Sequence, residues 1–366
     1  MRNNNTSCLS FPVATIILAI ACISCTPRPQ QFVTQGNTQL AYMGRIDHTD
    51  SATIFYWPGT SVTINFTGTG IQALLKDEKG KNYYNAIIDS TTIVKLSTDS
   101  IKHLYTIASG LRPGRHSVQL YKITEADKGK TWFYGFGLQE HDTILAPAPP
   151  QTRKIEFYGN SITCGYALED VTGDSKEPKY ENNYLSYAAI TARHHNAAYH
   201  CIAKSGIGLM LSWFHIIMPE MYDRINPEDT ASKWDFSKYT PNVVIINLCQ
   251  NDSWLVNKPD HAQFKARFGT TPPDEEHIVN SYKDFVLTIR SKYPDATIIC
   301  LLGSMDITKE GSPWPAYIEK AVALTNDQKI LTHFFPYKNT PGHPKAAEQE
   351  AMAQSLISFI DTHVKW

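Results

Sequence analysis

The chain has 366 residues, of which 42% are hydrophobic and 11% aromatic, and its formal net charge is −1. This length is enough for about two domains of roughly 150 residues each. The near-zero charge argues against a nucleic-acid partner, because such partners normally require a basic face.

The first segment is typical of an export signal. Arg2 precedes an apolar run at 11–23 that is too short to span a bilayer comfortably. The pattern resembles a bacterial lipoprotein signal, in which Cys25 would carry the lipid. Cys22 is the competing cysteine, and a plain cleaved signal peptide is the other alternative. We therefore expect an exported outer-membrane lipoprotein on the periplasmic or cell-surface face, held at the membrane through its lipid anchor only.

A proline-rich segment, APAPP at 146–150, divides the remaining chain. Before it, short runs of β-branched and aromatic residues alternate with turn signals such as Pro58-Gly59. This pattern predicts a β-sandwich of the jelly-roll type. The predicted divisions are a signal peptide at 1–24, a tether at 25–38, the β-sandwich at 39–145, a linker at 146–151 and a second domain at 152–366.

The second domain alternates strand-like and helix-like runs. The predicted strands are 153–159, 198–206, 242–249, 296–303 and 330–335, and the predicted helices are 182–195, 274–293, 314–324 and 343–363. Such alternation predicts an α/β fold, in which helices cover both faces of a parallel sheet. Ligands bind such sheets at the carboxyl ends of the strands.

Four residues suited to acyl transfer follow different predicted strands. Ser161 follows the first strand, Gly206 the second, Asn251 the third and His343 the fifth. A serine nucleophile needs a base, and its reaction intermediate needs hydrogen-bond donors for an oxyanion. His343 precedes Pro344, which suits the first turn of a helix.

These pieces in this order resemble the SGNH (GDSL-type) hydrolases, which have a three-layer, flavodoxin-like domain. Together with the β-rich segment carrying WPGTSVTINFTGTG, they resemble carbohydrate esterase family 2. That resemblance implies an esterase similar to acetylxylan esterases, which removes O-acetyl groups from plant polysaccharides. It implies an acetylated polysaccharide or oligosaccharide as partner, and neither a metal nor another cofactor.

The resemblance also implies roles for individual residues. Ser161 would be the nucleophile and His343 its general base. The N–H groups of Ser161 and Gly206 and the side-chain amide of Asn251 would form the oxyanion hole. Trp254 would stack on a sugar ring, and a core or lid position is an equal alternative for it.

Three departures from the family pattern stand out. Asn160 replaces the Asp of Gly-Asp-Ser, and Cys249 replaces a glycine, which could tighten its turn. The sequence TPGH, ending at His343, lacks the acid of D-x-x-H, which normally orients the histidine. A backbone carbonyl, of Pro341 or a neighbour, could accept the Nδ1–H instead, and Asp306 is a distant candidate.

Some alternatives stay open at this level. Gly208 competes with Gly206 as the oxyanion donor. The domain could have decayed into a glycan-binding lipoprotein, or it could be a lipase-like acyl hydrolase. The four cysteines after residue 150 could be buried thiols or disulfide-bonded. They are Cys164, Cys201, Cys249 and Cys300.

Overall fold

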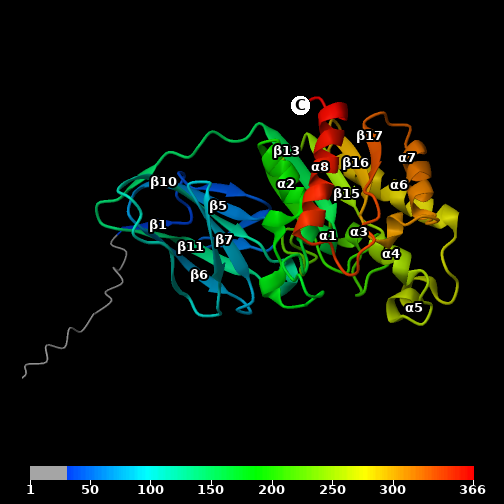
Figure 1. Ribbon diagram of the computed structural model, residues 1–366, viewed down its shortest axis with the longest axis horizontal. Coiled ribbons are helices and arrows are strands. Elements are labelled where there is room, and N and C mark those ends of the chain that lie inside the picture. Colours follow the sequence, from blue (N-terminus) through cyan, green and yellow to red (C-terminus); the bar gives the residue numbers. More distant parts are fainter. Residues whose placement is uncertain (1–30) are drawn as a thin grey trace, which may run out of the picture.

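The structure, a computed structural model, describes residues 31–366 and places a β-rich domain beside an α/β domain (Figure 1). The predicted signal peptide and the candidate lipidation site Cys25 lie outside the described residues, as does Cys22. An extended segment runs along the edge of the molecule from β12 (Thr143–Leu145) to β13 (Arg153–Gly159).

The β-rich domain is a sandwich of two antiparallel sheets, as the sequence predicted. It begins earlier than predicted, because β1 (Gln31–Thr34), inside the predicted tether, pairs with β11 (Thr131–Leu138). One six-stranded sheet has the order β3-β4-β11-β6-β9, with β1 on β11, and the other has the order β12-β5-β10-β7-β8, with β2 on β5. A core of aromatic and branched residues fills the space between them, including Phe55 stacked on Phe133. The strands are β1 (Gln31–Thr34), β2 (Ala41–Met43), β3 (Ile46–His48), β4 (Thr53–Phe55), β5 (Ser61–Gly68), β6 (Ile71–Asp77), β7 (Tyr83–Ile88), β8 (Thr92–Ser97), β9 (His103–Ala108), β10 (Gly114–Lys122), β11 (Thr131–Leu138) and β12 (Thr143–Leu145).

The α/β domain contains one five-stranded parallel sheet with the order β14-β13-β15-β16-β17. This order is the flavodoxin-like one, which confirms the predicted fold class. The strands are β13 (Arg153–Gly159), β14 (Ala197–Ala203), β15 (Val243–Asn247), β16 (Thr297–Leu302) and β17 (Ile330–Phe334). The helices are α1 (Ser161–Cys164), α2 (Tyr187–His194), α3 (Met218–Met221), α4 (Gln250–Leu255), α5 (Ala262–Phe268), α6 (Glu275–Lys292), α7 (Trp314–Ala323) and α8 (Ala346–His363).

Alternate residues of the strands face opposite helical layers, because successive side chains of a strand point to opposite faces. Phe157 and Ile245 belong to the core that includes residues of α2 and α8. Tyr158 and Ile246 belong to the core that includes residues of α6 and α7. Figure 1 shows α2 and α8 on one side of the sheet and α6 and α7 toward the other. The sheet is therefore a buried, rigid platform.

The register of the sheet aligns the ends of its central strands. Gly159, the last residue of β13, lies opposite Ala203 of β14 and Asn247 of β15. The chain segments that follow these three residues therefore leave the sheet at one edge. That edge includes the position between β13 and β15 where the strand order reverses, the usual place for a ligand in such folds.

Two predicted helix boundaries differ from the structure. The helix predicted from residue 182 begins at Tyr187, because Asn183 lies in a short 3₁₀ turn where its amide donates to the Thr163 carbonyl at 2.9 Å. Pro344 precedes α8 rather than occupying its first turn, since Lys345 is the N-cap of that helix.

Buried polar contacts join the two domains. The Arg45 guanidinium of the β-rich domain lies 3.3 Å from the Glu156 carboxylate of β13. Burial would raise the pKa of Glu156, but the charge of Arg45 and hydrogen bonds from its neighbours lower that pKa to about 2. The Trp57 indole N–H donates to the Ile225 carbonyl across the same boundary at 2.7 Å. The domains therefore pack as one body.

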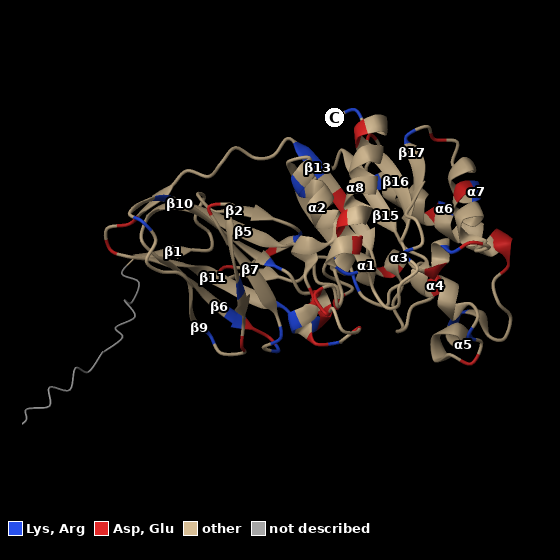
Figure 2. Ribbon diagram, in the orientation of Figure 1, with Lys and Arg blue, Asp and Glu red and all other residues tan. Residues whose placement is uncertain are grey.

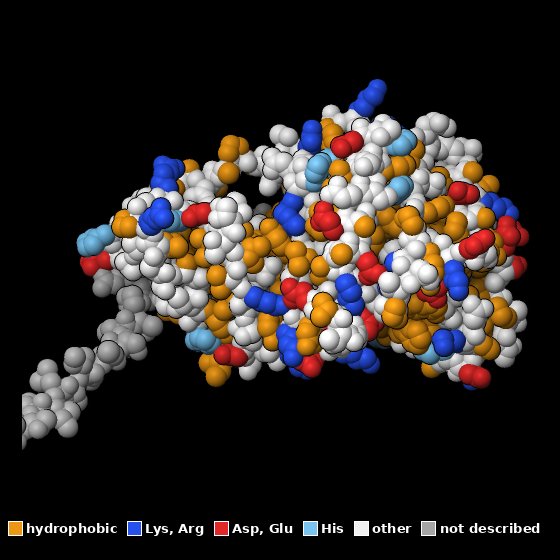
Figure 3. Space-filling model, in the orientation of Figure 1, with side chains coloured by type: hydrophobic (Ala, Val, Ile, Leu, Met, Phe, Trp, Pro, Cys, Tyr) orange, Lys and Arg blue, Asp and Glu red, His pale blue; other side chains and the backbone are white. Residues whose placement is uncertain are grey.

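The surface carries both signs of charge. In Figure 2, Lys and Arg are interspersed with Asp and Glu over both domains. Figure 3 shows hydrophobic side chains exposed on the side of the molecule that carries α4 and α5. None of the helices within residues 31–366 is both long enough and apolar enough to cross a membrane. The four cysteines left open by the sequence, at 164, 201, 249 and 300, are all buried free thiols.

Candidate active site

Ser161 stands on a sharp strand-to-helix turn at the end of β13. Asn160 caps α1, and its side-chain oxygen accepts the Ile162 N–H at 3.1 Å. A Cβ at Gly159 would lie 2.1 Å from Thr163 Oγ1, so the turn has no room for a larger residue. Asn160 thus supplies the cap without a charge. Ser161 is the first residue of α1, and only 7% of it is exposed.

His343 contacts the serine directly. Its Nε2 lies 2.8 Å from Ser161 Oγ, and its ring packs against Tyr166 with 4.7 Å between centroids. The preceding loop is held by the Lys338 ammonium, which donates to the Pro341 carbonyl at 3.2 Å. The Pro341 carbonyl was one candidate partner for His343 Nδ1, and the structure pairs it with Lys338 instead.

The partner of the histidine is Asp174, which sequence analysis missed. Asp174 Oδ2 lies 2.6 Å from His343 Nδ1, and Oδ1 accepts the His343 backbone N–H at 3.1 Å. An ionised carboxylate can only accept, so Nδ1 carries the proton and Nε2 is left to accept from Ser161. Asp306, the distant candidate, instead accepts the Trp254 indole N–H at 2.7 Å.

A glycine makes this approach of Asp174 possible. Gly342 has φ +70°, and a Cβ there would lie 3.2 Å from the Asp174 Cγ. The loop that carries Asp174 is fixed by Lys345, whose ammonium donates to the Ala167 and Gly173 carbonyls, each at 2.7 Å. The acid thus reaches the histidine from the loop after α1, rather than from the segment before the histidine.

The environment of Asp174 keeps it ionised. Partial burial raises its pKa, but hydrogen bonds from the His343 ring and backbone N–H, the positive charge that His343 carries when protonated, and the charge of Lys345 together lower the pKa to about 2. The carboxylate is therefore negative at neutral pH and can orient and stabilise a protonated His343.

The backbone N–H groups of Ser161 and Gly206 have no partner among residues 31–366. No described residue accepts a hydrogen bond from the N–H of Ser161 or of Gly206, which has φ +81°. The Gly208 N–H, by contrast, donates to Ser212 Oγ at 2.9 Å. This difference favours Gly206 over Gly208 as an oxyanion donor.

Asn251 lies at the start of α4 and is 3% exposed. Its amide nitrogen donates to the Ile207 carbonyl at 2.7 Å, and its oxygen accepts the Trp213 indole N–H at 3.0 Å. An indole N–H can only donate, so this contact fixes which way the amide points. The second hydrogen of the amide nitrogen remains available. Trp213 was missed as a contributor because its contact depends on the tertiary fold.

Asp252 shapes the loop after Gly206. Its buried carboxylate accepts the N–H groups of Leu209, Met210 and Leu211 at 2.7–2.9 Å. The preceding turn places Cys249 at φ +72°, a left-handed conformation that favours glycine. The cysteine therefore occupies a turn built for the glycine that it replaces.

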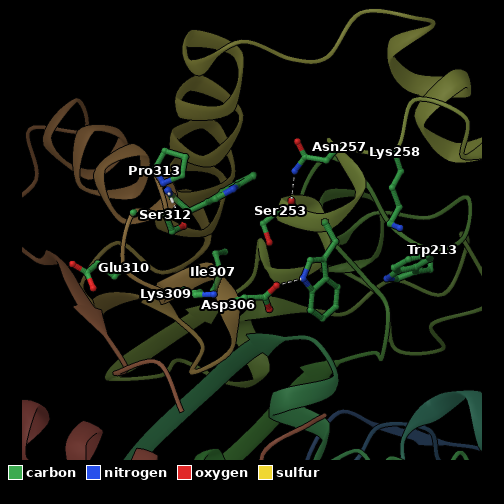
Figure 4. A pocket seen from close by; sticks show the side chains of 13 residues that line it. Trp213, Ser253, Asn257, Lys258, Asp306, Ile307, Lys309, Glu310, Ser312 and Pro313 are labelled. Carbon is green, nitrogen blue, oxygen red and sulfur yellow. Dashed lines mark hydrogen bonds between the residues drawn. The ribbon is translucent and has the colours of Figure 1, made fainter. Parts of the chain in front are cut away.

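A groove of about 750 Å³ lies beside α4 (Figure 4). Trp254 is half-buried in its wall, held by the Asp306 carboxylate, and Trp213 and Trp314 also line it. Trp254 shares α4 with Asn251, and Trp213 of the groove donates to the Asn251 side chain, so the groove adjoins Asn251. The groove can receive a ring-shaped ligand against aromatic side chains.

Two groups of side chains in residues 31–366 have the spacing of metal ligands. One is His194, His195 and Asp361, and the other is Glu125, Asp127 and Glu181. Neither group includes Ser161 or His343.

A serine at the switch point of a flavodoxin-like sheet, next to a histidine held by a carboxylate, defines the class of SGNH (GDSL-type) hydrolases. Residues 157–348 match the GDSL-like Lipase/Acylhydrolase family, and residues 42–149 match the Carbohydrate esterase 2 N-terminal family.

Named relatives agree with these matches. The chain is 35% identical to the Cellulase/esterase CelE of Acetivibrio thermocellus over 91% of its own length, and it spans 40% of that relative. It is 24% identical to an Acetylxylan esterase / glucomannan deacetylase of Cellvibrio japonicus, over 91% of each. It is 36% identical, with a TM-score of 0.77, to the structure of a family two carbohydrate esterase from Clostridium thermocellum in complex with cellohexaose, covering 88% of this chain and 98% of that one. The chain belongs to the family 2 carbohydrate esterases and is a carboxylic ester hydrolase.

The contact between Asp174 and His343 leads to a prediction for the variant Asp174→Asn. An amide offers no negative charge to an imidazolium and can hold the wrong tautomer, so kcat for 4-nitrophenyl acetate should fall about a hundredfold or more. The control is Glu177→Gln, which removes a surface carboxylate paired with Lys179. Equal rates for wild type and Asp174→Asn would contradict a role for Asp174.

Proposed function

We propose that this esterase is exported and removes O-acetyl groups from plant polysaccharides, such as acetylxylan or acetylated glucomannan. The observation that carries the proposal is the chain of hydrogen bonds from Ser161 through His343 to Asp174. The names of two relatives, which state acetylxylan esterase and glucomannan deacetylase activities, support the substrate class.

In the first step of the proposed reaction, Ser161 Oγ attacks the acetyl carbonyl carbon while its proton moves to His343 Nε2. The carbonyl oxygen becomes an oxyanion, which the N–H groups of Ser161 and Gly206 and the amide of Asn251 stabilise. Asp174 accepts from Nδ1 and stabilises the imidazolium that forms.

In the second step, the bond to the sugar oxygen breaks and His343 gives its proton to that oxygen, which releases the sugar hydroxyl. The acetyl group stays on Ser161 as an ester. Water then attacks this ester while His343 takes a proton from the water, and the collapse of the second intermediate releases acetate and returns the proton to Ser161.

The two other functions raised by the sequence have less support. A domain that had decayed into a glycan-binding module would not need His343 Nε2 to lie 2.8 Å from Ser161 Oγ. It would also not need the Asp174 carboxylate to accept a hydrogen bond from His343 Nδ1. A lipase would be expected to show an apolar lid, whereas the groove beside α4 mixes tryptophans with Asp306, Lys258 and Glu310.

The proposed function predicts the behaviour of two variants. Protein comprising residues 26–366 should release acetate from acetylated xylan or glucomannan and hydrolyse 4-nitrophenyl acetate. Ser161→Ala and His343→Ala should each lower kcat by at least about a thousandfold, since the serine and its base act as a unit. Circular dichroism would verify folding. A wild-type protein no faster than these variants on every acetylated glycan would refute the esterase function.

Long-chain acyl esters distinguish the lipase alternative. The same protein should hydrolyse 4-nitrophenyl acetate in preference to the palmitate ester. The opposite preference would support a lipase.

We further propose that Trp254 stacks on a sugar ring of the polymer. Trp254→Ala should raise KM on acetylated xylan about fivefold, the effect of losing roughly 1 kcal/mol of aromatic stacking. Trp254→Phe keeps a ring and should retain most of the affinity, and kcat on 4-nitrophenyl acetate should change little in either variant. Trp366→Ala, which removes a tryptophan at the chain end, is the control. An unchanged KM for Trp254→Ala would argue for a purely structural tryptophan.

Export and anchoring rest on residues 1–25 and on the sequence pattern alone. We propose that Cys25 is lipidated. In bacteria that express the full chain, Cys25→Ala should abolish palmitate labelling and move the protein from the membrane fraction to the soluble fraction, whereas Cys22→Ala should behave like wild type. Loss of labelling in Cys22→Ala alone would assign the lipid to Cys22, and no labelling of wild type would refute the anchor.

A further inference from the structure

A glutamate of the β-rich domain reaches the serine site of the α/β domain. Glu125 follows β10 and is the N-cap residue of a short 3₁₀ turn at Ala126–Lys128. Its side chain is fully buried at the boundary between the two domains. A buried carboxylate is costly unless it is hydrogen-bonded, so its contacts call for an explanation.

Glu125 binds the loop that follows β14. Its Oε2 accepts the Ser205 backbone N–H at 2.6 Å and lies 3.7 Å from the Cys164 thiol of α1. Ser205 directly precedes Gly206, whose free N–H is the proposed oxyanion donor. Cys164 belongs to the same helical turn that opens with Ser161. One carboxylate thus contacts both segments that supply backbone oxyanion donors.

The same loop is held at its other end by Asp252, which accepts the N–H groups of residues 209–211. Gly206 lies between these two carboxylates and takes a positive φ. Asp252 comes from the α/β domain and Glu125 from the β-rich domain. The position of the Gly206 N–H therefore depends on both domains.

We propose that Glu125 is a positioning residue, through which the β-rich domain holds Ser205 and aims the N–H of Gly206 at the oxyanion of the reacting ester. This inference rests on the proposed role of Gly206 in ester hydrolysis. It gives the β-rich domain a part in the reaction, in addition to any binding of polysaccharide.

Other charged groups surround this contact. Glu181 Oε2 accepts the Glu125 backbone N–H at 3.1 Å, and the Lys128 ammonium lies 2.8 Å from Glu181 Oε1. The same ammonium lies 3.0 Å from Asp127 Oδ2. Burial raises the pKa of Glu125, and burial together with the Glu125 charge raises the pKa of Glu181 to about 8.

The proposed role needs an acceptor for the Ser205 N–H rather than a negative charge. A glutamine at 125 has its side-chain carbonyl the same number of bonds from the backbone. It should therefore keep the hydrogen bond with the Ser205 N–H. An alanine offers no acceptor, and an aspartate is one methylene shorter and should fit poorly.

The test compares Glu125→Ala, Glu125→Asp and Glu125→Gln with Trp57→Phe, which loses a different cross-domain hydrogen bond. On 4-nitrophenyl acetate, Glu125→Ala and Glu125→Asp should lose about tenfold in kcat, with KM within about twofold of wild type, since a displaced oxyanion donor weakens the transition state more than the substrate complex. Glu125→Gln should stay within about threefold of wild type, and Trp57→Phe should match wild type.

Amide hydrogen exchange supplies a readout that does not depend on activity. Peptides covering residues 204–208 should exchange faster in Glu125→Ala or Glu125→Asp than in wild type, Glu125→Gln or Trp57→Phe. Exchange and kcat that stay unchanged in the folded Glu125→Ala or Glu125→Asp protein would overturn the inference. An equal loss of kcat in Trp57→Phe would overturn it as well. A wild type that hydrolyses no ester would refute the proposed function, and the exchange data would still decide whether Glu125 holds this loop.

Discussion

The site depends on the alignment of three strand ends in one parallel sheet. Gly159, Ala203 and Asn247 lie opposite one another, so the segments that carry Ser161, Gly206 and Asn251 leave the sheet at one edge. Hydrogen bonds then fix the side chains and the loop of the site, whose positions the sheet alone does not determine. Asp174 fixes His343, the Trp213 indole fixes the amide of Asn251, and Asp252 fixes the loop beyond Gly206.

The two domains are one unit in physical terms. Arg45 and Glu156 form a buried ion pair across the boundary, where leaving either charge alone would be costly. Glu125 crosses the same boundary to the loop of Ser205. A sandwich domain that was only a separate glycan-binding module would not need buried charged contacts of this kind.

The sequence predicted the fold, because the strands of the parallel sheet have clear apolar patterns. It also singled out four residues that come after those strands, although a loop separates His343 from the end of β17. The structure brings His343 Nε2 to 2.8 Å from Ser161 Oγ, and the oxyanion roles of Gly206 and Asn251 stay predictions. Asp174 could not be predicted, because it lies in an irregular loop far along the chain from His343 and meets it only in the folded protein. Trp213 and Glu125 were not predicted for a similar reason. Each contributes through one tertiary hydrogen bond, which leaves no periodic pattern in the sequence.

The most direct test of the account is to trap the acyl-enzyme. Wild-type protein mixed with 4-nitrophenyl acetate and quenched in acid within the first turnover would be digested and analysed by mass spectrometry. An acetyl group is expected on the peptide that carries Ser161, and none is expected on that peptide in His343→Ala. Turnover with no acetylated Ser161, or acetylation of a different residue that forms and decays at the catalytic rate, would contradict it.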